Sequence, residues 1–166
     1  CVSEEKRYVC DVPKELTREL NHRINRNDGK IPEKYFDFKK TSVGFACKRE
    51  GNKLLPVENT CLYCYLPAKK AKWGFGFLIN SDMIPTGPRD NVEPKEKINH
   101  VIAKIAGKQF FAWIHDLLNS HEYDYDSVFS LIPNFENCKE RYEEDEDVVK
   151  FIEEFQEGFE EELEEG

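Results

Sequence analysis

The stretch that decides the fold runs from Cys61 to Val92 and reads CLYCYLPAKKAKWGFGFLINSDMIPTGPRDNV. It holds two runs of aliphatic and aromatic residues, Cys61–Leu66 and Gly74–Asn80, which predict two strands. The nearly continuous apolar character of the first run predicts a central strand covered on both faces. In the second run, large residues alternate with glycines, so we expect one buried face and one face that another backbone or a helix can approach closely.

The residues before this stretch predict a strand, a helix and a second strand. Lys6–Val12 alternates weakly, as an edge strand does, and Pro13–Asn25 repeats leucine and isoleucine at the spacing of an amphipathic helix. Val43–Cys47 alternates between apolar and small or polar residues, and the turn residues Glu50-Gly51-Asn52 follow it. This part of the chain therefore adds strands to the same sheet.

The residues after the stretch predict helices. Pro94–Asn119 carries one broad apolar stripe, and a short helix is expected over Asp126–Ile132. We predict that residues 1–135 form a single α+β domain, with a mixed sheet of about four strands and packed helices. Residues 136–166 are expected to form an acidic C-terminal helix, either docked on the domain or leading to a further one. The residues expected in the core are Val43, Phe45, Leu62, Phe75, Phe77, Ile102 and Ile105.

Charge is distributed unevenly along the 166 residues. The formal net charge is -9, but residues 136–166 hold 15 Asp and Glu against 3 Lys and Arg, which leaves 18 acidic and 21 basic side chains in residues 1–135. The acidic tail repels phosphate backbones, so bulk charge does not favour general nucleic-acid binding, although a local basic patch can act alone. The absence of an apolar run near 18 residues, and of a signal segment, predicts a cytoplasmic protein without a membrane span.

The cysteines and histidines do not predict a metal or catalytic site. Cys61 and Cys64 form a CxxC, but an offset of three places their side chains on opposite faces of a strand, and no second CxxC or histidine pair completes a tetrahedral site. His100 and His115 share one predicted helix without the spacing of a metal pair. Since no nucleophile, base and orienting group come together in the sequence, an enzyme in its own right is not expected.

A basic loop between the two predicted strands is the first candidate binding site. It carries Lys69, Lys70, Lys72 and Trp73. Charge combined with an aromatic ring is the chemistry that binds single-stranded nucleic acid. One function class is therefore a stand-alone interaction module for a protein or for single-stranded nucleic acid.

The same stretch resembles a segment of sacsin-like ATPases, which belong to the superfamily of gyrase, the ninety-kilodalton heat-shock chaperone, histidine kinases and MutL. In these ATPases the segment follows the nucleotide-binding domain. The family's YLPT is present here as Tyr65-Leu66-Pro67-Ala68, and its FLINADF as Phe77–Met83. The arginine element ends at Arg89, where Pro88 replaces the family's serine. The resemblance covers about Pro32 to Leu118.

This resemblance implies the second function class, a non-catalytic middle, transducer-like domain that couples nucleotide state to client or partner contacts. It also implies a fold similar to the second domain of the ribosomal small-subunit fifth protein. The magnesium box E-x-x-x-N and the nucleotide loop D-x-G-x-G of the family are not present in this sequence. We therefore expect ATP and Mg²⁺ to be bound by an N-terminal nucleotide-binding domain of the parent protein, which would be the partner of this chain.

The resemblance also gives Arg89 a role. Relatives deliver a cation from this domain to the γ-phosphate of ATP, and a guanidinium suits that task because it stays charged and donates two directed hydrogen bonds. Arg89 is the first candidate, with Lys69 or Lys70 as the second. Without the resemblance, Arg89 reads as an ordinary surface arginine. Asp82 and Asp90 are expected either to orient Arg89 or to cap the following helix.

Overall fold

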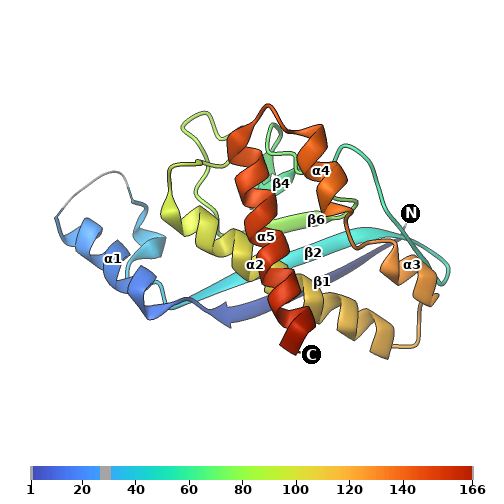
Figure 1. Cartoon of the computed structure of the whole chain (residues 1–166). Coiled ribbons are helices and arrows are strands. Elements are labelled where there is room, and N and C mark those ends of the chain that lie inside the picture. Colours follow the sequence, from blue (N-terminus) through green and yellow to red (C-terminus); the bar gives the residue numbers. More distant parts are fainter. Residues whose placement is uncertain (1, 27–30, 166) are drawn as a thin grey trace.

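A mixed six-stranded sheet with helices on one of its faces forms the body of the protein in the computed structural model, which describes residues 2–26 and 31–165 (Figure 1). The strands are β1 (Val2–Asp11), β2 (Lys40–Glu50), β3 (Lys53–Leu55), β4 (Leu62–Cys64), β5 (Leu66–Ala68) and β6 (Leu78–Ser81). Their order is β1-β2-β6-β4-β5, with β3 paired to β2. Only β4 and β6 pair in parallel among the described strands. The predicted mixed α+β sheet is confirmed, with more strands than the four expected.

The apolar run from Cys61 to Leu66 was predicted to form one central strand, but the structure shows two short strands instead. The chain reverses at Tyr65, whose φ of 68° is left-handed, and β4 and β5 form a tight hairpin with Leu62 opposite Ala68. The reversal leaves Tyr65 and Leu66 exposed over 57% and 63% of their surface. The apolar pattern gave no warning of this turn, because a left-handed position is usually occupied by glycine or asparagine rather than tyrosine.

The second predicted strand is shorter than expected. β6 begins only at Leu78, although Phe75, Phe77 and Ile79 are all buried, as their alternation predicted. Gly76 admits another chain segment, because a Cβ at this position would lie 2.7 Å from the Cβ of Pro56. That segment also pairs with it, since the Val57 N–H donates to the Gly76 carbonyl at 3.0 Å. The glycine therefore allows close approach of a loop rather than of a helix.

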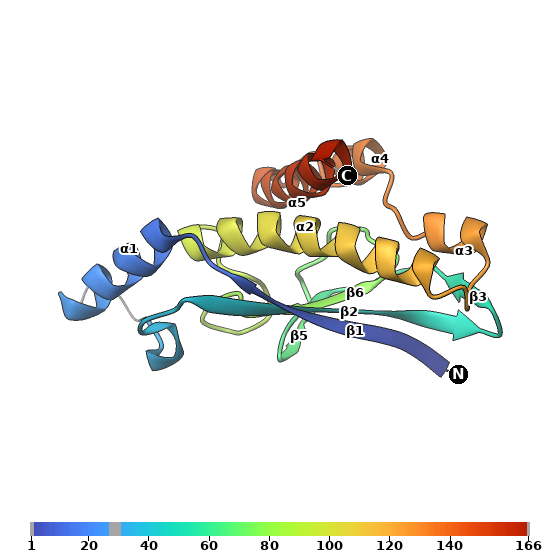
Figure 2. The same ribbon diagram turned by 90° about the horizontal axis from the view of Figure 1, so that it is seen from below.

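The helices are α1 (Lys14–Asn25), the short 3-10 helix η1 (Glu33–Tyr35), α2 (Lys97–Asn119), α3 (Tyr125–Phe129), α4 (Phe135–Arg141) and α5 (Glu146–Glu165). Helix α2 lies along one face of the sheet and α5 lies on the outer side of α2, whereas no α-helix of the described residues lies on the opposite face of the sheet (Figure 2). None of the helices in residues 2–26 and 31–165 is long and apolar enough to cross a membrane.

Aromatic rings fill the space between the sheet and α2. All seven residues predicted for the core are buried. Phe77 stacks on Phe110 with ring centroids 4.5 Å apart, and Phe45 stacks on Trp113 at 5.2 Å. Such contacts of β2 and of the residue before β6 with α2 fix the sheet to the helix and explain the high aromatic content of the chain.

The acidic C-terminal part was predicted to form one helix, but it forms the two helices α4 and α5. Helix α5 buries Val148, Ile152, Phe155 and Phe159 against the rest of the molecule. It crosses α2 at unusually short range, because α2 carries a glycine at the crossing point. A Cβ on that residue, Gly107, would lie 1.9 Å from the Phe155 carbonyl oxygen. The apolar stripe of α5 is thus docked on α2, and Glu157 and Glu161 of α5 form ion pairs with Lys104 of α2.

Candidate functional site

Arg89 lies in a tight turn between two paired residues. Pro85 and Val92 form an antiparallel bridge, and the Arg89 N–H donates to the Thr86 carbonyl at 2.8 Å. The φ of Arg89 is 63°, a left-handed conformation that is unfavourable for a residue with a side chain. Its guanidinium is exposed, and within residues 2–26 and 31–165 no hydrogen bond or ion pair holds it. The turn therefore fixes the backbone of Arg89 and leaves its charge available.

Asp90 ties this turn to the lysine loop. Its backbone carbonyl accepts a hydrogen bond from the Lys70 N–H at 2.7 Å, and its carboxylate lies 3.1 Å from the Lys70 ammonium. The Thr86 hydroxyl lies 3.3 Å from the same carboxylate. The hydrogen bond from Lys70 lowers the pKa of Asp90 below its ordinary value. The structure thus joins the turn that carries Arg89 to the loop that carries Lys70, and the exposed Lys69 precedes Lys70 in that loop.

We expected Asp82 either to orient Arg89 or to cap a helix, but its carboxylate binds other residues. One carboxylate oxygen accepts a hydrogen bond from the Tyr65 hydroxyl at 2.9 Å, and the other accepts from the Thr41 hydroxyl at 2.7 Å and the Ser42 N–H at 3.2 Å. The buried Tyr35 donates its hydroxyl to the backbone carbonyl of Asp82. Asp82 therefore joins the start of β2 to the β4–β5 hairpin.

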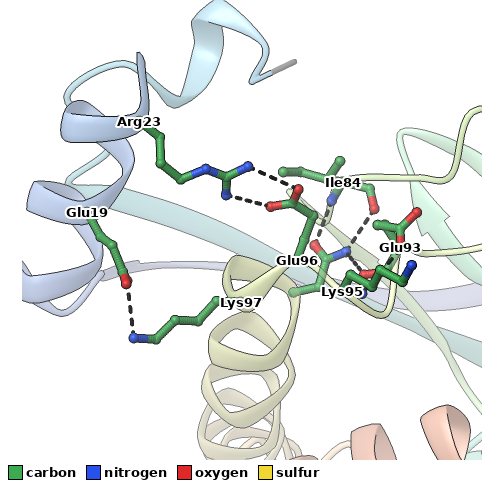
Figure 3. A network of polar contacts seen from close by, with 8 residues as sticks. Glu19, Arg23, Ile84, Glu93, Lys95, Glu96 and Lys97 are labelled. Carbon is green, nitrogen blue, oxygen red and sulfur yellow. Dashed lines mark hydrogen bonds and ion pairs between the residues drawn. The ribbon is translucent and has the colours of Figure 1, made fainter. Parts of the chain in front are cut away.

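Asp90 does not cap α2 either, because the residue before the helix is Glu96. The fully buried Asn99 holds the start of the helix instead. Its amide donates to the carbonyls of Ile84 and Glu93, both at 2.8 Å, and its oxygen accepts from the Ile84 N–H at 2.7 Å. Glu96 reaches across to α1, where Arg23 binds it through two contacts of 2.9 and 3.3 Å (Figure 3). These bonds fix both ends of the segment that carries Arg89.

A further cation, Lys34, was missed by the sequence reasoning. Its ammonium lies 4.9 Å from the ring centroids of both Tyr35 and Tyr65, in the geometry of a cation–π contact. Burial raises the pKa of the Cys64 thiol to about 11, and the nearby charges of Lys34 and Arg89 lower it to a smaller extent. Lys34 therefore lies beside the tip of the β4–β5 hairpin. No sequence signal pointed to the contact of Lys34 with Tyr65, because the two residues are 31 positions apart.

Trp73 is not part of the exposed loop, contrary to the prediction. Its side chain is only 3% exposed and stacks on Phe151 of α5, with ring centroids 5.7 Å apart. Lys72 is half-buried, whereas Lys69 and Lys70 are exposed. The indole is buried under α5, so a nucleic-acid base cannot stack on it. Helix α5 begins far later in the chain than Trp73. The candidate site therefore consists of cations without the tryptophan.

In the described ranges, no three side chains of His, Cys, Asp or Glu lie close enough to hold a metal ion. Comparisons of the chain with protein-family models, with curated proteins and with solved structures gave no match. The chemistry of the site is that of three exposed cations, Arg89, Lys69 and Lys70, on backbone that hydrogen bonds hold in place. Such an arrangement suits a phosphate or a carboxylate group.

Proposed function

We propose that this chain is a non-catalytic middle domain of a sacsin-like, chaperone-like ATPase. In this proposal it couples the nucleotide state of an adjoining nucleotide-binding domain to contacts with a client or partner, and it supplies Arg89 to the γ-phosphate. The observation that carries the proposal is the junction made by Asp90, which holds the arginine turn and the lysine loop together. A fold like the second domain of the ribosomal small-subunit fifth protein belongs to the same proposal.

The chemistry of ATP cleavage explains why such a junction is useful. Charge grows on the γ-phosphoryl oxygens in the transition state, and a positioned guanidinium stabilises it with directed hydrogen bonds. Positioning matters as much as charge, and the turn of Arg89 is anchored through Ile84 and Glu93 to the buried Asn99. ATP and Mg²⁺ are held by the adjoining domain in this scheme. The present chain adds a cation from outside.

The alternative of a single-stranded nucleic-acid module has less support. It needs an aromatic platform beside the lysines, and Trp73 is buried under α5. Charge alone would leave weak binding that falls steeply with salt. The observations on the site therefore favour a phosphate contact at one point over a track along a strand.

The direct test uses the full-length protein that carries this chain. We expect Arg89→Ala to leave nucleotide affinity nearly unchanged and to lower ATP turnover by roughly a hundredfold to a thousandfold, or about 3–4 kcal/mol of barrier. Arg89→Lys should recover part of the loss, because an ammonium cannot reproduce the planar fork of a guanidinium. Arg18→Ala is the matched control, since Arg18 is exposed on α1. Wild-type turnover by Arg89→Ala would contradict the proposal.

A second test concerns the chain by itself. We expect calorimetry with Mg-ATP to give at most weak binding, and a phosphate-release assay to give no hydrolysis, because the nucleotide motifs are not in this sequence. Tight binding of Mg-ATP by residues 1–166 would overturn the assignment of nucleotide binding to an adjoining domain.

A further inference from the structure

His100 lies on α2 between two groups that accept hydrogen bonds. Its Nδ1 is 2.5 Å from the carboxylate of Glu154 on α5, and its Nε2 is 2.6 Å from the backbone carbonyl of Pro94. The imidazole also stacks on Phe151 of α5, with ring centroids 4.4 Å apart. The histidine therefore joins three segments, which are the residues before α2, α2 itself and α5.

These two hydrogen bonds need two protons, whereas a neutral imidazole and an ionised carboxylate carry only one between them. The Pro94 carbonyl cannot donate, so Nε2 must hold a proton. In a neutral ring Nδ1 is then an acceptor, and it would face an ionised Glu154 with no hydrogen between the two atoms. The contact between Nδ1 and Glu154 therefore requires a further proton, held either by the ring or by the carboxyl group.

The surroundings of this pair help it to hold the proton. The side chains of His100 and Glu154 are only 17% and 21% exposed. Burial raises the pKa of Glu154, whereas His100 and Lys150 lower it to a smaller extent. A groove of about 940 Å³ lies beside the pair, and the other titratable or charged side chains that line it are Cys10, Asp11, Lys95, Lys97, Lys104, Lys108, Lys150 and Glu157.

We infer that one proton held between His100 and Glu154 clasps α5 to α2, and that α5 loosens when rising pH removes this proton. Without it, the lone pair of Nδ1 and the carboxylate repel each other, so the helices must separate there or the ring must leave its stack on Phe151. Imidazole changes its charge between about pH 5 and pH 8, which places the proton clasp near neutral pH. Its midpoint belongs to the pair rather than to either residue. The clasp does not depend on the proposed role of the arginine turn.

The other contacts between α2 and α5 do not respond to pH in this range. Lys104 binds Glu157 at 3.2 Å and Glu161 at 2.9 Å, and Lys108 binds Glu161 at 3.3 Å. Paired lysine and glutamate side chains keep their charges between about pH 5 and pH 9. The apolar stripe of α5 has no group that titrates. Loss of the proton therefore weakens the docking of α5 and leaves the rest of the fold in place.

The test is limited proteolysis of the 166-residue chain with a glutamate-specific protease, at pH values between about 6 and 9. Cleavage after Glu157, followed by mass spectrometry, requires α5 to open. Glu154→Gln is the matched control, because its amide can donate to a neutral Nδ1 and keeps the bond at every pH. Dividing the wild-type rate by the Glu154→Gln rate removes the pH dependence of the protease. We expect this ratio to rise with pH by up to about tenfold per unit, the limit for one proton.

A second variant separates the proton from the packing. His100→Phe can keep the stack on Phe151 but removes both hydrogen bonds, so we expect rapid cleavage whose ratio to Glu154→Gln does not change with pH. Nitrogen NMR of the His100 ring in the wild type should show a titration with the same midpoint as the cleavage ratio, and this measurement needs no substitution. A wild-type ratio that stays constant or falls as the pH rises would overturn the proton clasp, and so would a His100 ring that does not titrate in this range.

Discussion

Replacing Gly107 with alanine tests the packing of the acidic tail. A Cβ at this position would lie 1.9 Å from the Phe155 carbonyl oxygen and 2.9 Å from the Phe159 backbone nitrogen. Both atoms belong to the backbone of α5, so rotation of a side chain cannot relieve the clash. Helix α5 must move away from α2 by about 1 Å or more, which loosens the contacts of the buried Phe155 and Phe159 rings.

The size of the effect follows from two opposing contributions. Overpacking of a tight contact costs about 1–3 kcal/mol, and the upper end applies because backbone meets backbone. Alanine in place of glycine inside a helix returns about 1 kcal/mol. The net loss of unfolding free energy is therefore about 2 kcal/mol, which lowers the melting temperature by roughly 4–8 °C for a chain of this size.

Urea unfolding followed by the fluorescence of the buried tryptophans measures this loss. Gly158→Ala should behave similarly, because its Cβ would lie 2.0 Å from the Lys104 carbonyl oxygen. Gly87→Ala is the control, since nothing lies within 4 Å of a Cβ there, and we expect it to be neutral or to stabilise by up to about 1 kcal/mol. If Gly107→Ala is as stable as Gly87→Ala, the close crossing of α2 and α5 is wrong.

Three other predictions concern single residues. Arg89→Gly should be more stable than Arg89→Ala by about 1 kcal/mol in urea unfolding, because glycine adopts a φ of 63° without strain, and equal stabilities would rule out the left-handed turn. Burial raises the pKa of Cys47 to about 12 and of Cys64 to about 11. At pH 8 a thiol reagent should therefore label the half-buried Cys61 before either of them. Faster labelling of Cys64 than of Cys61 would contradict the burial of Cys64. Burial also raises the pKa of the Glu154 carboxyl group. The protonated form of Glu154 therefore stabilises the fold at pH values below the unfolded carboxyl pKa of about 4.3. This stabilisation is lost as the pH rises through the pKa of Glu154 in the folded protein. Glu154→Gln should remove this decline from a series of urea titrations above pH 4, and a decline that persists would assign it to another group.

Local patterns in the sequence were sufficient for several of the regular elements. The amphipathic spacing of α1, the stripe of α2 and the turn at Gly51 after β2 all rest on neighbouring residues, and the structure has each of them. The reversal at Tyr65 was missed because it depends on Asn80 and Asp82, which lie 15 and 17 residues away. A turn imposed by distant side chains leaves no local signature.

In the candidate site, too, the residue types could be predicted from the sequence but their contacts could not. Arg89 and Lys70 were recognisable as residue types within one stretch, but the link between the arginine turn and Lys70 depends on the backbone and carboxylate of Asp90. Trp73 was misplaced because its neighbours in the sequence are lysines, whereas its neighbours in space belong to α5. The glycines at the crossing of α2 and α5 were the available signal for that packing, since glycine inside a helix usually marks a close approach.

The central claim, that Arg89 reaches the γ-phosphate of a bound nucleotide, is tested most directly by photoaffinity labelling. The full-length protein would be irradiated with an ATP analogue that carries its photoreactive group on the γ-phosphate, and the labelled peptides would be mapped by mass spectrometry. We expect a label within residues 61–92, at or beside the turn of residues 86–91. Labelled peptides from the nucleotide-binding domain alone, with none from residues 61–92, would contradict it.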